Sequence, residues 1–198
     1  MANCCLNTIR IEGPEADLLL LKQRINAVRK EKNKKGWDLY RLLLRLGVQE
    51  ETAAAADCRD DFTGGDATIE DGVLHLDTES AWSFADEGWE LLRTMFPEID
   101  VYYLAEEPAN GVFVTNDIAR KYFKSIYYLD FSEDGEESQT EYFDDEKSLV
   151  DYVRDNFDNS VSTFRQARQA LTDFSNSGRD SYAELLTISY DNESNLIH

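Results

Sequence analysis

The sequence predicts an α+β fold built from two parts. Segments in which apolar and polar residues alternate, as in half-buried strands, stand between segments with the 3.6-residue apolar period of helices. In residues 1–115 the order of these segments is β-α-connector-β-β-α-β, which is typical of a ferredoxin-like split βαβ antiparallel sheet. Residues 116–198 predict an α+β C-terminal extension made of a β-hairpin plus helices. We expect this extension to pack on the ferredoxin-like domain, and the two could form one continuous domain.

The chain begins with a predicted β–α unit. Residues 3–12 alternate as a strand, and one of its faces carries Cys5, Asn7, Ile9 and Ile11. Gly13-Pro14 ends this strand, and a proline suits the first turn of the helix that follows. The apolar stripe of that helix consists of Leu18, Leu21, Ile25 and Val28.

A basic connector leads into the least regular part of the chain. It belongs to a cluster of cationic side chains formed by Lys22, Arg24, Arg29, Lys30, Lys32, Lys34 and Lys35. Residues 37–47 predict a short helix that ends at Gly47. We expect residues 49–66, rich in Ala, Asp and Gly, to form a loop with a turn at Gly64-Gly65. The alanine run within them would also suit a helix.

A hairpin, a helix and a strand complete the first predicted domain. Residues 67–71 and 73–82 predict two strands joined at Asp71-Gly72, a pair typical of two-residue hairpin turns. An amphipathic helix over about 86–96 and a strand at 99–105 follow.

The extension continues with the same two kinds of pattern. We expect a short strand, the two strands of a hairpin around Asp134-Gly135, two helices and a final strand, at 111–115, 123–132, 138–143, 146–157, 162–174 and 184–190. Asp144 or Asp145 is placed to cap the first of these helices.

Two separated segments resemble one known family. The first runs from Asn3 to Pro14 (NCCLNTIRIEGP) and resembles the opening of the YubB-type ferredoxin-like family, found on bacterial plasmids and phages. The second begins at Thr78 with TESAWS and continues through a helix and Phe96-Pro97 to the strand VYYL, which is similar to the family's Thr-Ala-Trp-Ser signature and terminal strand. The resemblance implies a ferredoxin-like fold and a mobile-element origin. It implies no activity.

The charge of the chain excludes some partners and favours others. A net charge of −20 repels phosphate backbones and anionic lipid, so we expect no direct binding to nucleic acid and no membrane association. The excess of acidic residues is concentrated between Asp130 and Asp158. This segment contains twelve acidic residues and only two basic ones, Lys147 and Arg154. These candidate interaction residues are Asp130, Glu133, Asp134, Glu136, Glu137, Glu141, Asp144, Asp145, Glu146, Asp151, Asp155 and Asp158.

Two interpretations of this acidic segment are open. In the first interpretation the segment is only a solvated surface, which is what most acidic runs are. The functional hypothesis is a non-catalytic interaction protein that binds a basic protein partner through the acidic surface, in one form by imitating the charge spacing of DNA. Aromatic residues between the acids favour the hypothesis, because aromatics are enriched at interfaces.

The potentially reactive side chains of the sequence do not converge. His75, Asp77 and Glu79 form a row along one strand face, whereas metal ligands must approach an ion from different directions. Neighbours on a strand point to opposite faces, which separates Cys4 from Cys5 and Glu106 from Glu107. The sequence therefore predicts no catalytic residue, no cofactor and no metal site.

An alternative function places a site between the two parts of the chain. In this hypothesis the protein is a small-molecule enzyme or ligand-binding protein, and its site lies near Asn7, Trp82 and Glu106. Polar and aromatic residues recur there, at the ends of the predicted sheet.

Cysteine use and the absence of apolar runs indicate a compartment. The three cysteines are an odd number without Cys-x-x-Cys spacing, and the N-terminal residues do not have the pattern of a secretory signal. We expect a cytoplasmic location. The oligomeric state is left open by the sequence.

Overall fold

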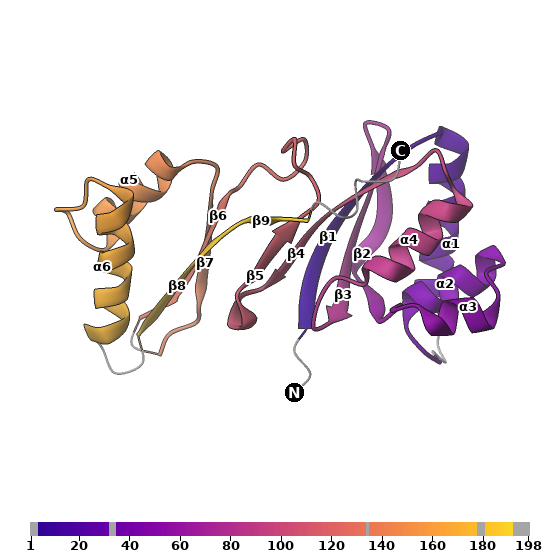
Figure 1. The fold of residues 1–198 in the computed structure, drawn as a ribbon, viewed down its shortest axis with the longest axis horizontal. Helices are drawn as coiled ribbons and strands as arrows, with labels where there is room; N and C mark the ends of the chain where they lie inside the picture. The colour runs from indigo at the N-terminus through magenta and orange to yellow at the C-terminus, as the bar shows by residue number, and fades with distance from the viewer. Residues whose placement is uncertain (1–3, 32–34, 134, 178–180, 192–198) are drawn as a thin grey trace. The chain divides into compact units, whose positions relative to one another are not determined.

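The computed structural model describes residues 4–31, 35–133, 135–177 and 181–191 (Figure 1). These contain six α-helices and two sheets, which confirms the α+β class. The chain divides into two compact units built from non-contiguous segments. The first unit holds Met1–Glu107, Val114–Asp117 and Asp191, and the second holds Pro108–Phe113 and Ile118–Tyr190. That the extension packs on the first domain stays a prediction.

The first unit is built on an antiparallel sheet. Four of the six strands in this sheet are β1 (Cys4–Glu12), β2 (Asp60–Glu70), β3 (Val73–Ala81) and β4 (Asp100–Glu107). They lie in the order β2-β3-β1-β4, so the first strand is central and the hairpin β2–β3 lies to one side of it. In the hairpin turn both Asp71 and Gly72 have positive φ, 50° and 78°, as the sequence pair predicted.

Helices cover one face of this sheet. They are α1 (Glu15–Arg29), α2 (Asp38–Leu46), α3 (Glu50–Ala55) and α4 (Asp86–Met95), gathered at one side of the strands in Figure 1. The face of β1 that carries Cys5, Asn7, Ile9 and Ile11 is buried. The stripe of α1 that was predicted to be buried is Leu18, Leu21, Ile25 and Val28, all 1% exposed or less.

The loop predicted over residues 49–66 is wrong. Its alanine run forms α3, and β2 already begins at Asp60, where Asp60 and Phe62 lie opposite Ser80 and Thr78. Gly64-Gly65 do not end the strand. They lie within a register shift between Thr63 and Thr68, so the glycines form a bulge in a continuing strand. Pairing with β3, which is distant in sequence, thus decided the conformation of a segment with weak local preferences.

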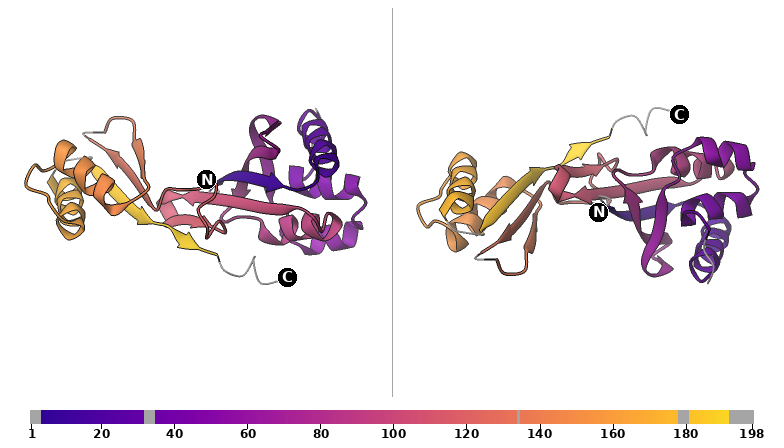
Figure 2. Two further views of the ribbon diagram at one scale, coloured as in Figure 1. Left: turned by 90° about the horizontal axis from the view of Figure 1, so that it is seen from above. Right: turned by 90° about the horizontal axis from the view of Figure 1, so that it is seen from below.

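The second unit consists of two layers, a sheet and a pair of helices. Its three-stranded antiparallel sheet has the order β7-β6-β8, with β6 (Tyr127–Ser132), β7 (Gln139–Phe143) and β8 (Tyr182–Thr187). Both of its helices, α5 (Glu146–Asn156) and α6 (Phe164–Ser177), lie on one side of this sheet (Figure 2). The predicted turn at Asp134 lies outside the described residues.

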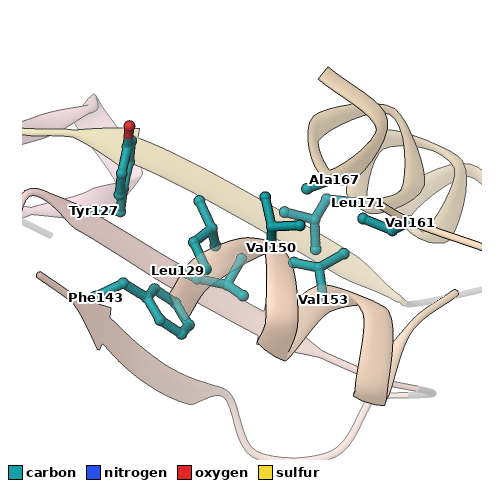
Figure 3. Packing of buried hydrophobic residues seen from close by; sticks show 9 residues of the cluster. Tyr127, Leu129, Phe143, Val150, Val153, Val161, Ala167 and Leu171 are labelled. Atoms are coloured by element: carbon teal, nitrogen blue, oxygen red, sulfur yellow. The ribbon is translucent and has the colours of Figure 1, made fainter. Parts of the chain in front are cut away.

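A separate core holds this unit together. Figure 3 shows Leu129 and Phe143 of the sheet beside Val150 and Val153 of α5. Tyr127 belongs to the same buried cluster, to which α6 adds Ala167 and Leu171. Leu129 and Val153 are fully buried.

Shorter elements connect the units. They are the 3₁₀ turn η1 (Pro108–Asn110), β5 (Val112–Thr115) and β9 (Ser189–Tyr190). The final strand predicted at 184–190 is therefore two strands, with a break at Ile188. Within the described ranges, no helix has both the length and the apolar content needed to cross a bilayer.

Candidate functional site

The three residues of the small-molecule hypothesis do not share one side of the sheet. In the register of β1 with β4, Asn7 lies opposite Ala105, and Glu106 lies opposite Leu6. Successive residues of a strand alternate between faces, so the side chains of Asn7 and Glu106 point to opposite faces. Trp82 follows the end of β3 with a φ of 75° and is 56% exposed.

Asn7 instead belongs to a buried hydrogen-bond network beneath the helices. Its side-chain amide donates to Ser80 Oγ at 2.9 Å and to Thr78 Oγ1 at 3.1 Å. Antiparallel pairing creates these contacts, because β1 and β3 place Asn7 opposite Thr78 and Cys5 opposite Ser80. The two segments that the sequence singled out as motifs thus meet in one network. The polar residues at core-facing positions were its signal in the sequence.

Asp60 continues the buried row onto β2. It lies opposite Ser80, is fully buried, and accepts a hydrogen bond from Trp89 Nε1 to its Oδ2 at 2.8 Å. Its Oδ1 has no hydrogen-bond partner among the described residues. Burial raises the pKa of the Asp60 carboxyl to about 7, although hydrogen bonds from Thr78 and Trp89 lower it. Sequence reasoning missed Asp60 because it placed this residue in a loop.

The network has little capacity for chemistry. Burial raises the pKa of the Cys5 thiol to about 11, so the nucleophilic thiolate is scarce at neutral pH. His75 lies opposite Arg10, on the other face of the sheet. Burial, followed by the nearby Arg10, lowers the pKa of His75. Among the described residues, therefore, no imidazole lies on the Ser80 side of the sheet to activate its hydroxyl. We therefore assign the network a structural role.

A cavity beside the network is too small for a ligand. It lies between α4 and β4, has a volume of about 10 Å³ and is lined in part by Phe84, Trp89 and Tyr103. The rings of Phe84 and Tyr103 stack with 3.7 Å between centroids and form part of its wall. A volume of this size holds about one water molecule. In the described part of the chain, no group of three or more His, Cys, Asp or Glu side chains is arranged to hold a metal ion.

The acidic segment lies on β6, β7 and α5 of the second unit and on the turns around them. Of its twelve residues, Asp134 is outside the described residues. The described aspartates all have local partners. Asp145 caps α5 by accepting from the backbone N–H of Ser148 at 2.8 Å, and Asp158 accepts from the backbone N–H of Ser160 at 2.9 Å. These two capping bonds lower the pKa of each carboxyl.

The other aspartates are held by side chains. Asp151 forms ion pairs with Lys147 and Arg154, and Arg154 also pairs with Asp155. Asp144 accepts from Ser125 Oγ at 2.8 Å. Asp130 accepts from the hydroxyl of Tyr182 at 2.8 Å. The aspartates of the segment therefore contribute to the local fold of the second unit.

The glutamates of the segment differ from the aspartates. None of the five makes a side-chain hydrogen bond or ion pair with the described part of the chain; they are Glu133, Glu136, Glu137, Glu141 and Glu146. All except Glu141 are exposed, and Glu141 is half-buried. We call this set the five glutamates. Glu146 lies in the first turn of α5, where its charge complements the positive end of the helix. The charges of the other four have no contact in the described part of the fold.

The aromatic residues between the acids mostly face the core. Tyr127 and Phe143 belong to the buried cluster, and Tyr152 and Phe157 pack against it. Tyr142, by contrast, is 44% exposed. The aromatic content of the segment therefore overstates the aromatic content of its surface.

Comparison of the chain with protein-family models, with curated proteins and with solved structures finds no match. The functional argument consequently depends on the residues of this chain alone. Among them, the five glutamates lie where the acidic excess of the chain is concentrated, so the surface around them is the candidate interaction site.

Proposed function

We propose that this chain is a non-catalytic interaction protein that binds a basic protein partner through the acidic surface of its second unit. The observation that supports this is a difference between the aspartates and the glutamates of the acidic segment in the contacts that their side chains make. Asp145 caps α5 and the other described aspartates bond or pair with neighbouring residues, whereas the five glutamates make no side-chain hydrogen bond or ion pair with the described residues. Crowded like charges repel one another, and a cationic surface relieves that repulsion and accelerates encounter. A spacing of carboxylates that imitates DNA phosphates would direct the surface to the DNA-binding site of the partner.

The first unit supports a more specific assignment of fold and origin. Its strand order, β2-β3-β1-β4, with α1 and α4 as the connecting helices, favours a ferredoxin-like split βαβ arrangement. Hydrogen bonds from Asn7 to Thr78 and Ser80 join the two segments that resemble the YubB-type family. We extend the proposal to membership of that family, a mobile-element origin and a cytoplasmic location.

A pull-down from bacterial lysate across a salt series tests the proposal. Immobilised full-length chain should recover a basic protein at low salt and lose it well before ~0.5 M NaCl, where charges are screened within a few ångströms. A variant with the five glutamates changed to glutamine should lose this protein. A control with five exposed glutamates of the first unit changed to glutamine should retain it: Glu15, Glu50, Glu51, Glu70 and Glu98.

The recovered protein is then purified and titrated against both variants by calorimetry. Equal loss of affinity in the two variants would mean that net charge, and not the acidic surface, drives binding. Recovery of no basic protein at any salt concentration would reject the proposed function.

A further inference from the structure

The sheet of the second unit has an outer face that neither α5 nor α6 covers. Tyr127 and Leu129 on β6 belong to the core between sheet and helices. Alternation therefore directs the side chains of Tyr128, Asp130 and Ser132 to the other face. Tyr128 and Ser132 are buried there, Tyr128 with the ring of Phe113 at 5.7 Å between centroids, and Asp130 is half-buried. The central position of this face is occupied by a charge, at Asp130.

A second carboxylate faces Asp130 across the sheet. In the register of β6 with β8, Asp130 lies directly opposite Glu184. Like charges at opposed positions of neighbouring strands destabilise a sheet. Partial burial and then the charge of Asp130 raise the pKa of Glu184. Neither carboxylate forms an ion pair with a lysine or arginine that the structure describes.

Hydrogen bonds hold Asp130 in place without neutralising it. Tyr182 donates its hydroxyl hydrogen to Asp130 Oδ2 at 2.8 Å, and Thr140 Oγ1 lies 3.4 Å from Oδ1. Both donors are uncharged. The fold therefore orients one carboxylate beside another and supplies no cation for the pair.

Exposed tyrosines lie at both ends of this carboxylate pair. Tyr142 lies opposite Tyr128 in the register of β6 with β7, and the two rings are 5.3 Å apart between centroids. At the other end Tyr182 lies opposite Ser132. Tyr142 is 44% exposed and Tyr182 is 39% exposed, which leaves aromatic surface on either side of the acids.

We propose that the outer face of this sheet is the docking site for an arginine side chain on the basic partner, with Asp130 and Glu184 as its acceptors and a tyrosine ring as its stacking surface. A guanidinium has planar donors that bond two carboxylate oxygens at once, and it stacks on aromatic rings. An ammonium forms such a bidentate, stacked contact less well. The inference rests on the proposed function, and it assigns the specific contact to the pair Asp130–Glu184 while the five glutamates supply attraction at longer range.

Titration of the ¹⁵N-labelled full-length chain with a defined peptide tests this site. The probe is a twelve-residue peptide of alternating arginine and serine, compared with the same peptide in which lysine replaces arginine. We expect amide shifts to concentrate at Asp130, Thr140, Tyr142, Tyr182 and Glu184, and the arginine peptide to bind more tightly. The double variant Asp130→Asn/Glu184→Gln should bind about tenfold more weakly, because charge-assisted hydrogen bonds are lost.

The matched control is Glu50→Gln/Glu51→Gln, which removes the same charge from exposed positions of α3 in the first unit and should bind less than threefold more weakly. If the Asp130→Asn/Glu184→Gln variant is unfolded by circular dichroism, Tyr142→Ser replaces it, because that change removes a stacking ring and no charge. Shifts confined to residues 133–137 would overturn this inference and leave the proposed function standing. Equal affinity for the arginine and lysine peptides would also overturn it. No shift with either peptide would reject the proposed function itself.

Discussion

Asp60 is an acidic residue buried in the core of the first unit. Its carboxyl is fully buried beside Trp89 and Ser80, and burial raises its pKa to about 7. The charges of Asp61 and Asp57 add to this increase. An ordinary aspartate titrates near pH 4, so the folded chain retains a proton on Asp60 that the unfolded chain has already released.

We expect the free energy of unfolding to fall as pH rises from about 4 to about 7. In this window the folded state binds more protons than the unfolded state, so the slope is negative and reaches up to ~1.4 kcal/mol per pH unit. Above the folded pKa both states are ionised and the penalty remains constant. Urea denaturation of Asp60→Asn, followed by Trp fluorescence, should lack this component and show higher stability at pH 8.

Asp77→Asn, an exposed change on β3, is the control and should keep the slope of the parent chain. A parent and an Asp60→Asn variant with the same pH profile would show that Asp60 is ionised throughout.

At the scale of elements, local signals in the sequence differ in how well they define a boundary. The sequence offered Asp144 and Asp145 as caps for α5, and the structure selects Asp145. Its backbone is extended, with φ −153° and ψ 163°, which allows its carboxylate to reach the N–H of Ser148. Asp144 lies one residue too early and accepts from Ser125 instead.

Replacing Asp145 with alanine should destabilise the second unit by about 1 kcal/mol, the usual contribution of an N-cap. Asp144→Ala should cost less, because its hydrogen bond is an exposed side-chain contact. Hydrogen exchange of the α5 amides measures the loss of stability in both variants. Equal protection in the two variants would contradict the capping assignment.

Gly88 sets how closely α4 approaches its neighbours. A Cβ at this position would lie 2.7 Å from Leu39 Cδ2 of α2 and 2.9 Å from the carbonyl oxygen of Asp57. We expect Gly88→Ala to destabilise the first unit by about 1–3 kcal/mol through overpacking, despite the better helix propensity of alanine. The control is Gly65→Ala, where a Cβ meets nothing within 4 Å. Thermal denaturation of the two variants compares them, and a Gly88→Ala chain as stable as the control would refute tight packing.

At the scale of the whole molecule, the net charge of −20 acts on both units at once. Self-repulsion opposes the compact state, and salt screens it. Raising NaCl from ~0.02 M to ~0.5 M, where the Debye length falls below ~5 Å, should therefore raise the Tm. The variant with the five glutamates changed to glutamine should gain less from salt than the parent. A Tm that falls with added salt would mean that attractive ion pairs outweigh the repulsion.

The division of the chain into two units was harder to predict from the sequence. The strand and helix patterns suggested a single boundary between residues 115 and 116. Asp191, however, belongs to the first unit, where its backbone N–H donates to Thr115 O at 2.9 Å and its side chain accepts from the Tyr103 hydroxyl at 2.7 Å. Contacts between residues so far apart in the chain have no local signature.

The sequence by itself determined the α+β class, most strands and helices, and the buried face of α1. These properties follow from apolar periodicity, and a strand or helix with one apolar face has few ways to bury it. It also located the excess of acid. Only the tertiary structure separated Asn7 from Glu106, joined Asn7 to Ser80, buried Asp60, and set Asp130 opposite Glu184. Each of these depends on the register between strands distant in sequence, because a shift of one residue would turn every side chain to the other face.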